Sequence, residues 1–379
     1  MGEILLFISA FIGLFLGLLF LKKDDSPMSF FPTALGCFLT ELCIGIILSK
    51  IYATFSIAVD LRSMGMAYVA AGMAIWGYSI KIKRFQKLKI CLWDIYSYTI
   101  IILWFLVLFF SIFTPKLLNR YINSDAASHF TFALNFMDSG RISGMHFGEL
   151  FNGLILSIAA PFLTRLSLYK VYILSDAFAN LINVFMFYTL ATTVCRHKIV
   201  KVFLPFLSFG YFLGWPLFSY ILGGFGYLAW GVTLFAYAIH LLIRFYNSNE
   251  KKFQLLMLIG VGINCIGLAF CYMLFLPLLG ITILLTFILK MRKNHFKYSF
   301  KKIVFCGLGG LILGCIVVLS CYKGFFDGSV QNIFDALRLD GWTHKDLYRD
   351  FVFLMPAVFY MGWRYIRDRK VNFIFTSTA

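Results

Sequence analysis

The residues best placed to do chemistry lie in residues 116–149, the longest region between hydrophobic runs that could hold a polar site. Asn123 or Ser124 can cap a short helix whose first turn contains Asp125. His129 follows four residues later, so a helix places it on the same face as Asp125. A carboxylate there can take a proton from an acceptor hydroxyl or hold a divalent ion beside a phosphate, and a histidine can orient it. Asp125 and His129 are therefore the candidate catalytic residues.

The same helix carries apolar side chains that would hold it at a boundary. Phe130 and Phe136 lie among its polar residues, which favours a helix that lies against a membrane or a protein roof. His146 and Glu149 come after the helix and before the next hydrophobic run, and they are candidate substrate-binding residues. An alternative role for Asp125 is only to stabilise the helix N-terminus, worth about 0.3 to 1 kcal/mol.

A second polar stretch, residues 323–349, has mixed charge. It contains Arg338, His344 and Arg349, which are further candidates for substrate binding. Arginine suits a phosphate or pyrophosphate because its planar guanidinium donates two parallel hydrogen bonds. The alternative is that this stretch is a solvated connection without a ligand.

The composition predicts a membrane protein. The chain has 379 residues, of which 61% are hydrophobic and 13% charged, and its mean hydropathy is +0.84. Apolar runs of about 18 to 24 residues match the length that a helix needs to cross a bilayer. We expect an all-α polytopic membrane protein with about 10 to 12 membrane-crossing helices and two extracytoplasmic loops that carry short interfacial helices. The nine cysteines contain no CxxC pair, so we interpret them as small packing residues.

The positive charges predict the topology. The formal charge of +17 comes from lysines and arginines that collect in short loops, which indicates anchoring at the cytoplasmic face of a cell membrane and no nucleic-acid partner. The basic clusters in 82–89, 244–252 and 290–302 are expected inside, and the stretches 116–149 and 323–349 outside. The number of crossings between positions 149 and 196 must then be odd, which leaves open whether the short run 151–163 crosses.

The chain is expected to begin with accessory membrane helices in residues 1–89 and to continue with a core in residues 90–379. The first apolar run lacks a basic start and a small-residue cleavage site, so we expect it to remain as a span. The last residues, 371–379, resemble the start of another hydrophobic run that is cut short.

Three carboxylates lie within or beside hydrophobic runs: Glu41, Asp94 and Asp176. Ionisable groups in a membrane are costly and often mark proton or ion coupling. The alternative is a hydrogen bond between helices or a position at the interface. Asp176 is the strongest of the three candidates.

A span that leaves the cytoplasm, an outer loop with an acidic residue on a short interfacial helix, and a series of hydrophobic hairpins together resemble the GT-C superfamily of polytopic glycosyltransferases. The segment NSDAASH, which contains Asp125, occupies the place of the acidic residue in the first outer loop of that superfamily. The resemblance implies a donor sugar linked to polyprenyl phosphate, an extracytoplasmic glycan, lipid or protein acceptor, and an inverting transfer with Asp125 as base. A divalent cation such as Mg²⁺ or Mn²⁺ is a candidate cofactor. Many members have two adjacent acids at this place, and Ala126 replaces the second one here, which speaks against metal binding.

Other functions stay open from the sequence. A lipid-linked glycan polymerase or ligase would share the topology and rely more on arginines of the outer loops. A transporter or flippase would place its decisive charges near the middle of the bilayer. A non-catalytic scaffold would tolerate neutral substitutions at every outer charge. No P-loop, GxSxG, HExxH or glycine fingerprint is present, so the sequence does not support nucleotide chemistry.

Overall fold

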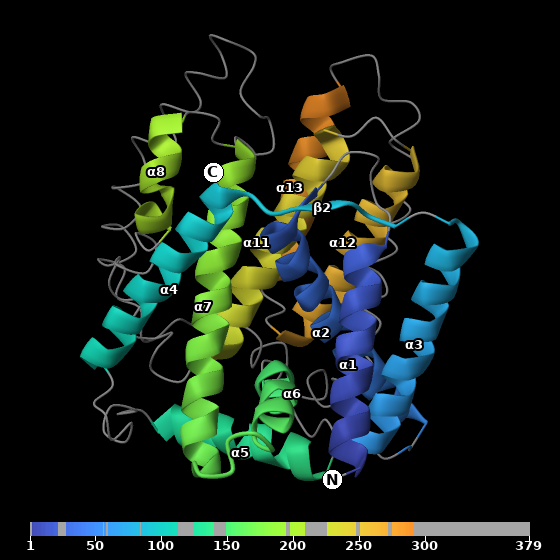
Figure 1. Cartoon of the computed structure of the whole chain (residues 1–379), viewed down its shortest axis with the longest axis vertical. Coiled ribbons are helices and arrows are strands. Elements are labelled where there is room, and N and C mark those ends of the chain that lie inside the picture. The colour runs from blue at the N-terminus through green and yellow to red at the C-terminus, as the bar shows by residue number, and fades with distance from the viewer. Residues whose placement is uncertain are drawn as a thin grey trace, which may run out of the picture. The chain divides into compact units, whose positions relative to one another are not determined.

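The computed structural model of the chain is built almost entirely from helices (Figure 1). The structure describes residues 2–21, 28–55, 57, 60–83, 85–112, 124–139, 149–194, 198–208, 226–247, 251–271 and 275–291. The chain divides into two compact units, residues 1–276 and 277–379, and every described helix before α13 (Phe275–Met291) lies in the first unit.

Six helices of the described part are long and apolar enough to cross a membrane. They are α1 (Gly2–Phe20), α2 (Phe30–Thr54), α4 (Leu92–Ile112), α7 (Leu168–Val194), α11 (Gly226–Asn247) and α12 (Lys251–Cys271). The prediction of a helical, multi-pass membrane protein is thereby confirmed. The further spans predicted after residue 291 lie outside the described residues, and the boundary between residues 89 and 90 stays a prediction.

The first three helices pack through small residues. The helix α3 (Leu61–Lys81) runs alongside α1, and a Cβ on Gly65 would lie only 3.2 Å from the backbone of Phe7. Farther along, the Trp76 indole donates a hydrogen bond of 3.1 Å to the Gly13 carbonyl oxygen. Small residues let two membrane helices approach closely, which gives the van der Waals contact that holds them together in lipid.

The start of α3 is fixed by a capping box. The Asp60 side chain accepts a hydrogen bond of 2.7 Å from the Ser63 amide, and the Ser63 hydroxyl accepts one of 3.0 Å from the Asp60 amide. These bonds satisfy two amide groups that would otherwise lack a helical partner, an effect typically worth about 1 kcal/mol. Asp60 and Ser63 thus fix where α3 begins.

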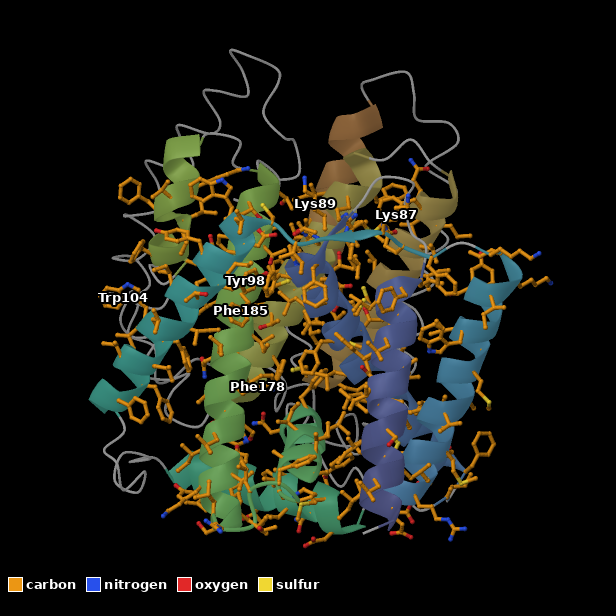
Figure 2. The ribbon with its side chains drawn as sticks, viewed as in Figure 1. Lys87, Lys89, Tyr98, Trp104, Phe178 and Phe185 are labelled. Carbon is orange, nitrogen blue, oxygen red and sulfur yellow. The ribbon has the colours of Figure 1, made fainter. Side chains whose placement is uncertain are left out.

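One end of the first unit is tied by a short pair of strands, which the all-α prediction did not include. The strands β1 (Met28–Ser29) and β2 (Leu88–Lys89) pair in parallel, and Figure 1 shows β2 at the upper end of the helices, between α4 and α3. The Ser29 hydroxyl also donates to the Asp94 carboxylate at the start of α4. We call this the strand end, and Figure 2 labels Lys87 and Lys89 there.

The helices α4, α7, α11 and α12 also reach the strand end. Tyr98, near the start of α4, lies 4.7 Å from the ring of Phe185 and shares a hydrogen bond of 2.9 Å with the Thr189 hydroxyl (Figure 2). Arg244, near the end of α11, lies over the ring of Phe253 at the start of α12. The same arginine approaches the Met28 sulfur at 3.7 Å. The strand β2, the end of α11 and the start of α12 therefore lie at the same end of the helices.

The opposite end carries α5 (Ser124–Ser139), which lies across it in Figure 1. The Phe130 ring of α5 contacts Tyr169 and Tyr172 in the first turns of α7, at centroid distances of 5.2 and 5.3 Å. We call this the α5 end. The described part of the stretch 116–149, α5, thus lies at the end opposite to the strand end, and the side of the membrane that each end faces stays a prediction.

The helix α6 (Glu149–Ala159) covers most of the run 151–163, for which the sequence left open whether it crosses the membrane. Its 11 residues extend about 16 Å, roughly half of the hydrocarbon core of a bilayer. Its early residue Asn152 bonds to Asp176, two turns into α7, whereas its later residue Leu156 packs on Val171 and Tyr172 near the start of α7. This half-length helix therefore starts at depth and ends at the α5 end, and α7 is the described helix of membrane length between positions 149 and 194.

Of the six membrane-length helices, α4 is the least buried: only 22% of its apolar segment is buried inside the protein. Leu103, Val107 and Phe110 are among its exposed side chains. On another side, the ring of Trp104, labelled in Figure 2, meets Phe206 of α8 (Lys198–Leu207) at 6.1 Å. Such a surface suits contact with lipid chains.

The arrangement predicts the accessibility of engineered cysteines. In a variant with the native cysteines replaced, Lys83→Cys and Lys87→Cys should react with an impermeant maleimide from one side of sealed vesicles, and Asp138→Cys from the other. All three parent side chains are exposed, so burial should not prevent the reaction. Labelling of Lys87→Cys and Asp138→Cys from the same side would contradict the two-ended arrangement.

Candidate functional site

The helix α5 places the predicted catalytic positions at the α5 end, directly after the span α4. Position 125 lies in its first turn, and the side chain of Asp125 is outside the described residues. His129 lies one turn later, is partly buried, and meets the Phe132 ring edge-on at 6.4 Å. Helical spacing puts positions 125, 129, 132 and 136 in one stripe.

This stripe belongs to the packed side of α5. A Cβ on Gly153 of α6 would lie 2.5 Å from the Phe136 ring, so the two helices touch where the glycine leaves room. The side chains exposed on the other side of α5 are Ala127, Ser128, Thr131, Asn135 and Asp138. The described members of the stripe, His129, Phe132 and Phe136, thus lie on the side of α5 that is packed, opposite to its exposed residues.

Most of the predicted substrate-binding side chains cannot be placed. His146, Arg338, His344 and Arg349 lie outside the described residues. Glu149 is the first residue of α6, and only its backbone is described. The convergence of the two polar stretches on one site therefore stays a prediction.

A second polar centre lies inside the bundle, around Asp176. The Asp176 carboxylate accepts a hydrogen bond of 2.9 Å from the Asn152 side-chain amide of α6. The Asn152 carbonyl oxygen accepts one of 3.0 Å from the Trp230 indole of α11. All three side chains are at most 1% exposed. The chain of bonds joins three helices that are far apart in sequence.

Gly226 completes this centre. It is the first residue of α11, and a Cβ there would overlap the Asp176 carboxylate and lie 2.8 Å from the Asn152 amide. The glycine therefore lets a carboxylate reach the N-terminal turn of a helix, where the backbone amides lack helical partners and favour negative charge. Asp176 lies about 12 Å along α7 from Leu168, well inside the apolar layer.

The polar bonding continues toward the strand end. The Asn183 amide of α7 donates to the Ala229 carbonyl oxygen at 3.0 Å and to the Thr233 hydroxyl at 2.9 Å. The Asn264 amide of α12 donates to the Leu234 carbonyl oxygen at 2.6 Å. Sequence reasoning named Asp176 but missed these asparagines, although Asp176, Asn180 and Asn183 follow the spacing of one helical face.

The two centres differ in the chemistry they permit. Positions 125 and 129 lie at an end of the helices, where a lipid-linked headgroup and an aqueous acceptor can meet. The Asp176 centre lies within the apolar layer, where a carboxylate can bind a proton or a cation or can serve only to join helices. No group of three or more His, Cys, Asp or Glu side chains is arranged to hold a metal ion among the described residues, which do not include the side chain of Asp125.

The contact at Gly226 predicts a loss of stability on enlargement. Gly226→Ala should lower the free energy of unfolding by about 1 to 3 kcal/mol, because the new methyl group overlaps Asp176. Gly262→Ala in α12 is the matched control, since a Cβ there meets nothing within 4 Å, and it should be neutral or stabilising by up to about 1 kcal/mol. Thermal unfolding in detergent measures both, and equal midpoints would contradict the packing at Gly226.

Comparison of the chain with protein-family models, with curated proteins and with solved structures gives no match. No relative therefore supplies an activity or a set of functional residues. The resemblance to the GT-C superfamily rests on the order of the segments and on Asp125.

Proposed function

We propose that the chain is a cell-membrane glycosyltransferase that moves a sugar from a polyprenyl-phosphate-linked donor to an extracytoplasmic glycan, lipid or protein. Asp125 acts as the base in this proposal. It takes the proton from the acceptor hydroxyl while the hydroxyl oxygen attacks the anomeric carbon, and the polyprenyl phosphate leaves with the bonding electrons. His129, one turn along α5, orients the carboxylate or binds a phosphate oxygen.

The observation that carries the proposal is the placement of α5. This helix follows the membrane-length helix α4, lies across one end of the first unit, and contains positions 125 and 129 in its first two turns. A polyprenyl-linked donor has its tail in the bilayer and its phosphate at the surface, so its reactive carbon lies at the same level as such a helix. The exposed apolar side chains of α4 offer a surface for the tail.

The remaining predicted residues have roles at the donor phosphate. Arg338 and Arg349 can each donate two hydrogen bonds to it, and His146 and His344 can donate one. Glu149 is the first residue of α6 and so lies at the deeper end of that helix, and a role for it at the sugar stays a prediction. A divalent cation, Mg²⁺ or Mn²⁺, stays a candidate for the same phosphate.

The central test is Asp125→Asn. The substitution keeps the size of the side chain and much of its capacity to cap a helix, but it removes the base, so transfer should fall about 10² to 10⁴-fold. Transfer from a panel of polyprenyl-phosphate sugars by the purified protein in lipid is the measurement. Thermal unfolding should stay nearly unchanged.

Two variants control for the loss of a carboxylate. Asp138→Asn removes an exposed acid from the other end of α5, and Asp94→Asn removes one at the strand end. Both should retain transfer. If Asp125→Asn transfers sugar like the wild type, Asp125 only caps α5 and the proposal loses its residue-level support.

The Asp176 centre favours a second candidate function, a transporter or flippase. Transporters often place a charged residue at mid-bilayer depth where half-length helices begin. Here the starts of α6 and α11 meet Asp176, through Asn152 and Gly226. These features fit coupling of substrate movement to a proton or ion.

The substitution Asp176→Asn distinguishes a transporter or flippase from a glycosyltransferase. In proteoliposomes, an ion-coupled transporter should lose at least about tenfold of its ion-driven movement of a polyprenyl-phosphate sugar, because the carboxylate that binds the ion is gone. Asp125→Asn should leave that movement intact. The reverse pattern, with movement insensitive to Asp176→Asn, would assign Asp176 to helix packing alone.

A further inference from the structure

A third buried carboxylate, Glu41, lies apart from both centres. It is completely buried in α2, and neither of its carboxylate oxygens has a hydrogen-bond partner among the described residues. Glu41 is 11 residues after Phe30 and 13 before Thr54, so it lies about 17 and 20 Å from the two ends of α2. These distances place it near the middle of a bilayer core of about 30 Å.

The surroundings of Glu41 are aromatic. One turn earlier on the same face, Phe38 contacts Phe11 of α1 at 6.3 Å and Phe178 of α7 at 5.8 Å. The centroid of the Phe178 ring, labelled in Figure 2, lies 6.4 Å from that of the Trp230 ring. Rings of four helices thus lie together one turn from the buried Glu41.

A polar group of α3, the Tyr68 hydroxyl, lies near Glu41. One turn after Glu41, Gly45 leaves room for this hydroxyl, which would overlap a Cβ at that position. Tyr68 is fully buried, its hydroxyl has no hydrogen-bond partner among the described residues, and it interacts electrostatically with the Glu41 carboxyl. Two polar groups therefore share an apolar region that satisfies neither by a hydrogen bond.

No cation compensates Glu41 within the described residues. The titratable groups that the adjoining helices hold near this depth are Tyr68 of α3, Cys37 and Cys43 of α2, Cys265 of α12, Asp176 of α7 and Tyr237 of α11, and none of them carries positive charge. His240, the nearest basic residue along α11, is buried and stacks on the Tyr237 ring at 6.5 Å. An ionised carboxylate without a partner costs several kcal/mol in such a place, about as an unpaired buried charge does elsewhere. A neutral carboxyl avoids that cost, so the site favours a bound proton.

We propose that Glu41 is an intramembrane proton-binding site, whose carboxyl is held neutral by the aromatic surroundings that α1, α2, α3 and α7 provide. The site does not depend on the proposed sugar transfer. Its ligand is a proton taken up by one Glu41 oxygen, and release of that proton leaves a carboxylate that the surroundings disfavour.

The test uses dicyclohexylcarbodiimide, an apolar reagent that reacts with protonated carboxyl groups. The carboxyl proton moves to a carbodiimide nitrogen and the carboxylate oxygen bonds to the central carbon, so nothing leaves and a stable adduct forms after rearrangement. At pH 7 an ordinary glutamate is almost wholly ionised. Peptide mass spectrometry of the full-length protein should nevertheless find the adduct on Glu41, and not on the exposed Glu3 or Asp138.

Further arms of the experiment distinguish a bound proton from a bound metal ion. Glu41→Gln should remove the adduct, Asp176→Asn should keep it, and a water-soluble carbodiimide should not form it. Replacing choline chloride with sodium, potassium or lithium chloride should leave the yield unchanged. Protection by one of these cations would identify a metal-ion site and overturn the proposal, as would an unlabelled Glu41 in the wild type.

A second measurement does not depend on the reagent. If the folded protein binds a proton that the unfolded chain releases, its stability falls as the pH rises. The thermal midpoint of the wild type should therefore fall relative to that of Glu41→Gln between pH 6 and pH 9. A difference that stays constant across this range contradicts proton binding by Glu41. Sugar transfer enters neither measurement, so failure here leaves the proposed function untouched.

Discussion

A polar group inside a bilayer has to find its partner within the protein, and the first unit depends on how Asp176 meets that requirement. Its carboxylate takes the Asn152 amide of α6 and approaches the first residue of α11, Gly226. Lipid offers no hydrogen bond to compete, so the three helices can satisfy their polar groups only by remaining together. Tertiary contact therefore holds α6 in place, because a helix of 11 residues in the apolar layer is too short to reach both surfaces.

The position of α5 follows from the position of α6. Phe136 of α5 fits against Gly153, and Ala133 belongs to the same buried cluster as Leu156. A change at Asp176 can thus reach α5 through α6 without any contact with Asp125. Because such coupling is physical packing, a loss of activity after substitution at Asp176 would not alone assign that residue to chemistry.

The sequence predicted the long elements well, because about 20 apolar residues allow few structures other than a crossing helix. The first apolar run corresponds to α1, and α5 begins where Ser124 and Asp125 indicated. The distribution of lysine and arginine predicts an odd number of crossings between positions 149 and 196. This number stays a prediction, although the 11 residues of α6 are too few to cross a bilayer. The strands β1 and β2 were not predicted, since two residues on each side leave no periodicity to detect.

The hydrogen bonds inside the bundle could not be predicted from the sequence, because the bonded residues lie far apart along the chain. The spacing of Asp176, Asn180 and Asn183 marks a polar face on α7, but Asn152 is 24 residues away and Gly226 is 50 residues away from Asp176. Only the fold shows that Asp176 has an amide donor whereas Glu41 has no hydrogen-bond partner among the described residues. Asp176 and Glu41 look alike in the sequence, and burial of the charged form costs free energy for both. Asp176 offsets that cost by hydrogen bonding to a neighbouring helix, and in our proposal Glu41 avoids it by binding a proton.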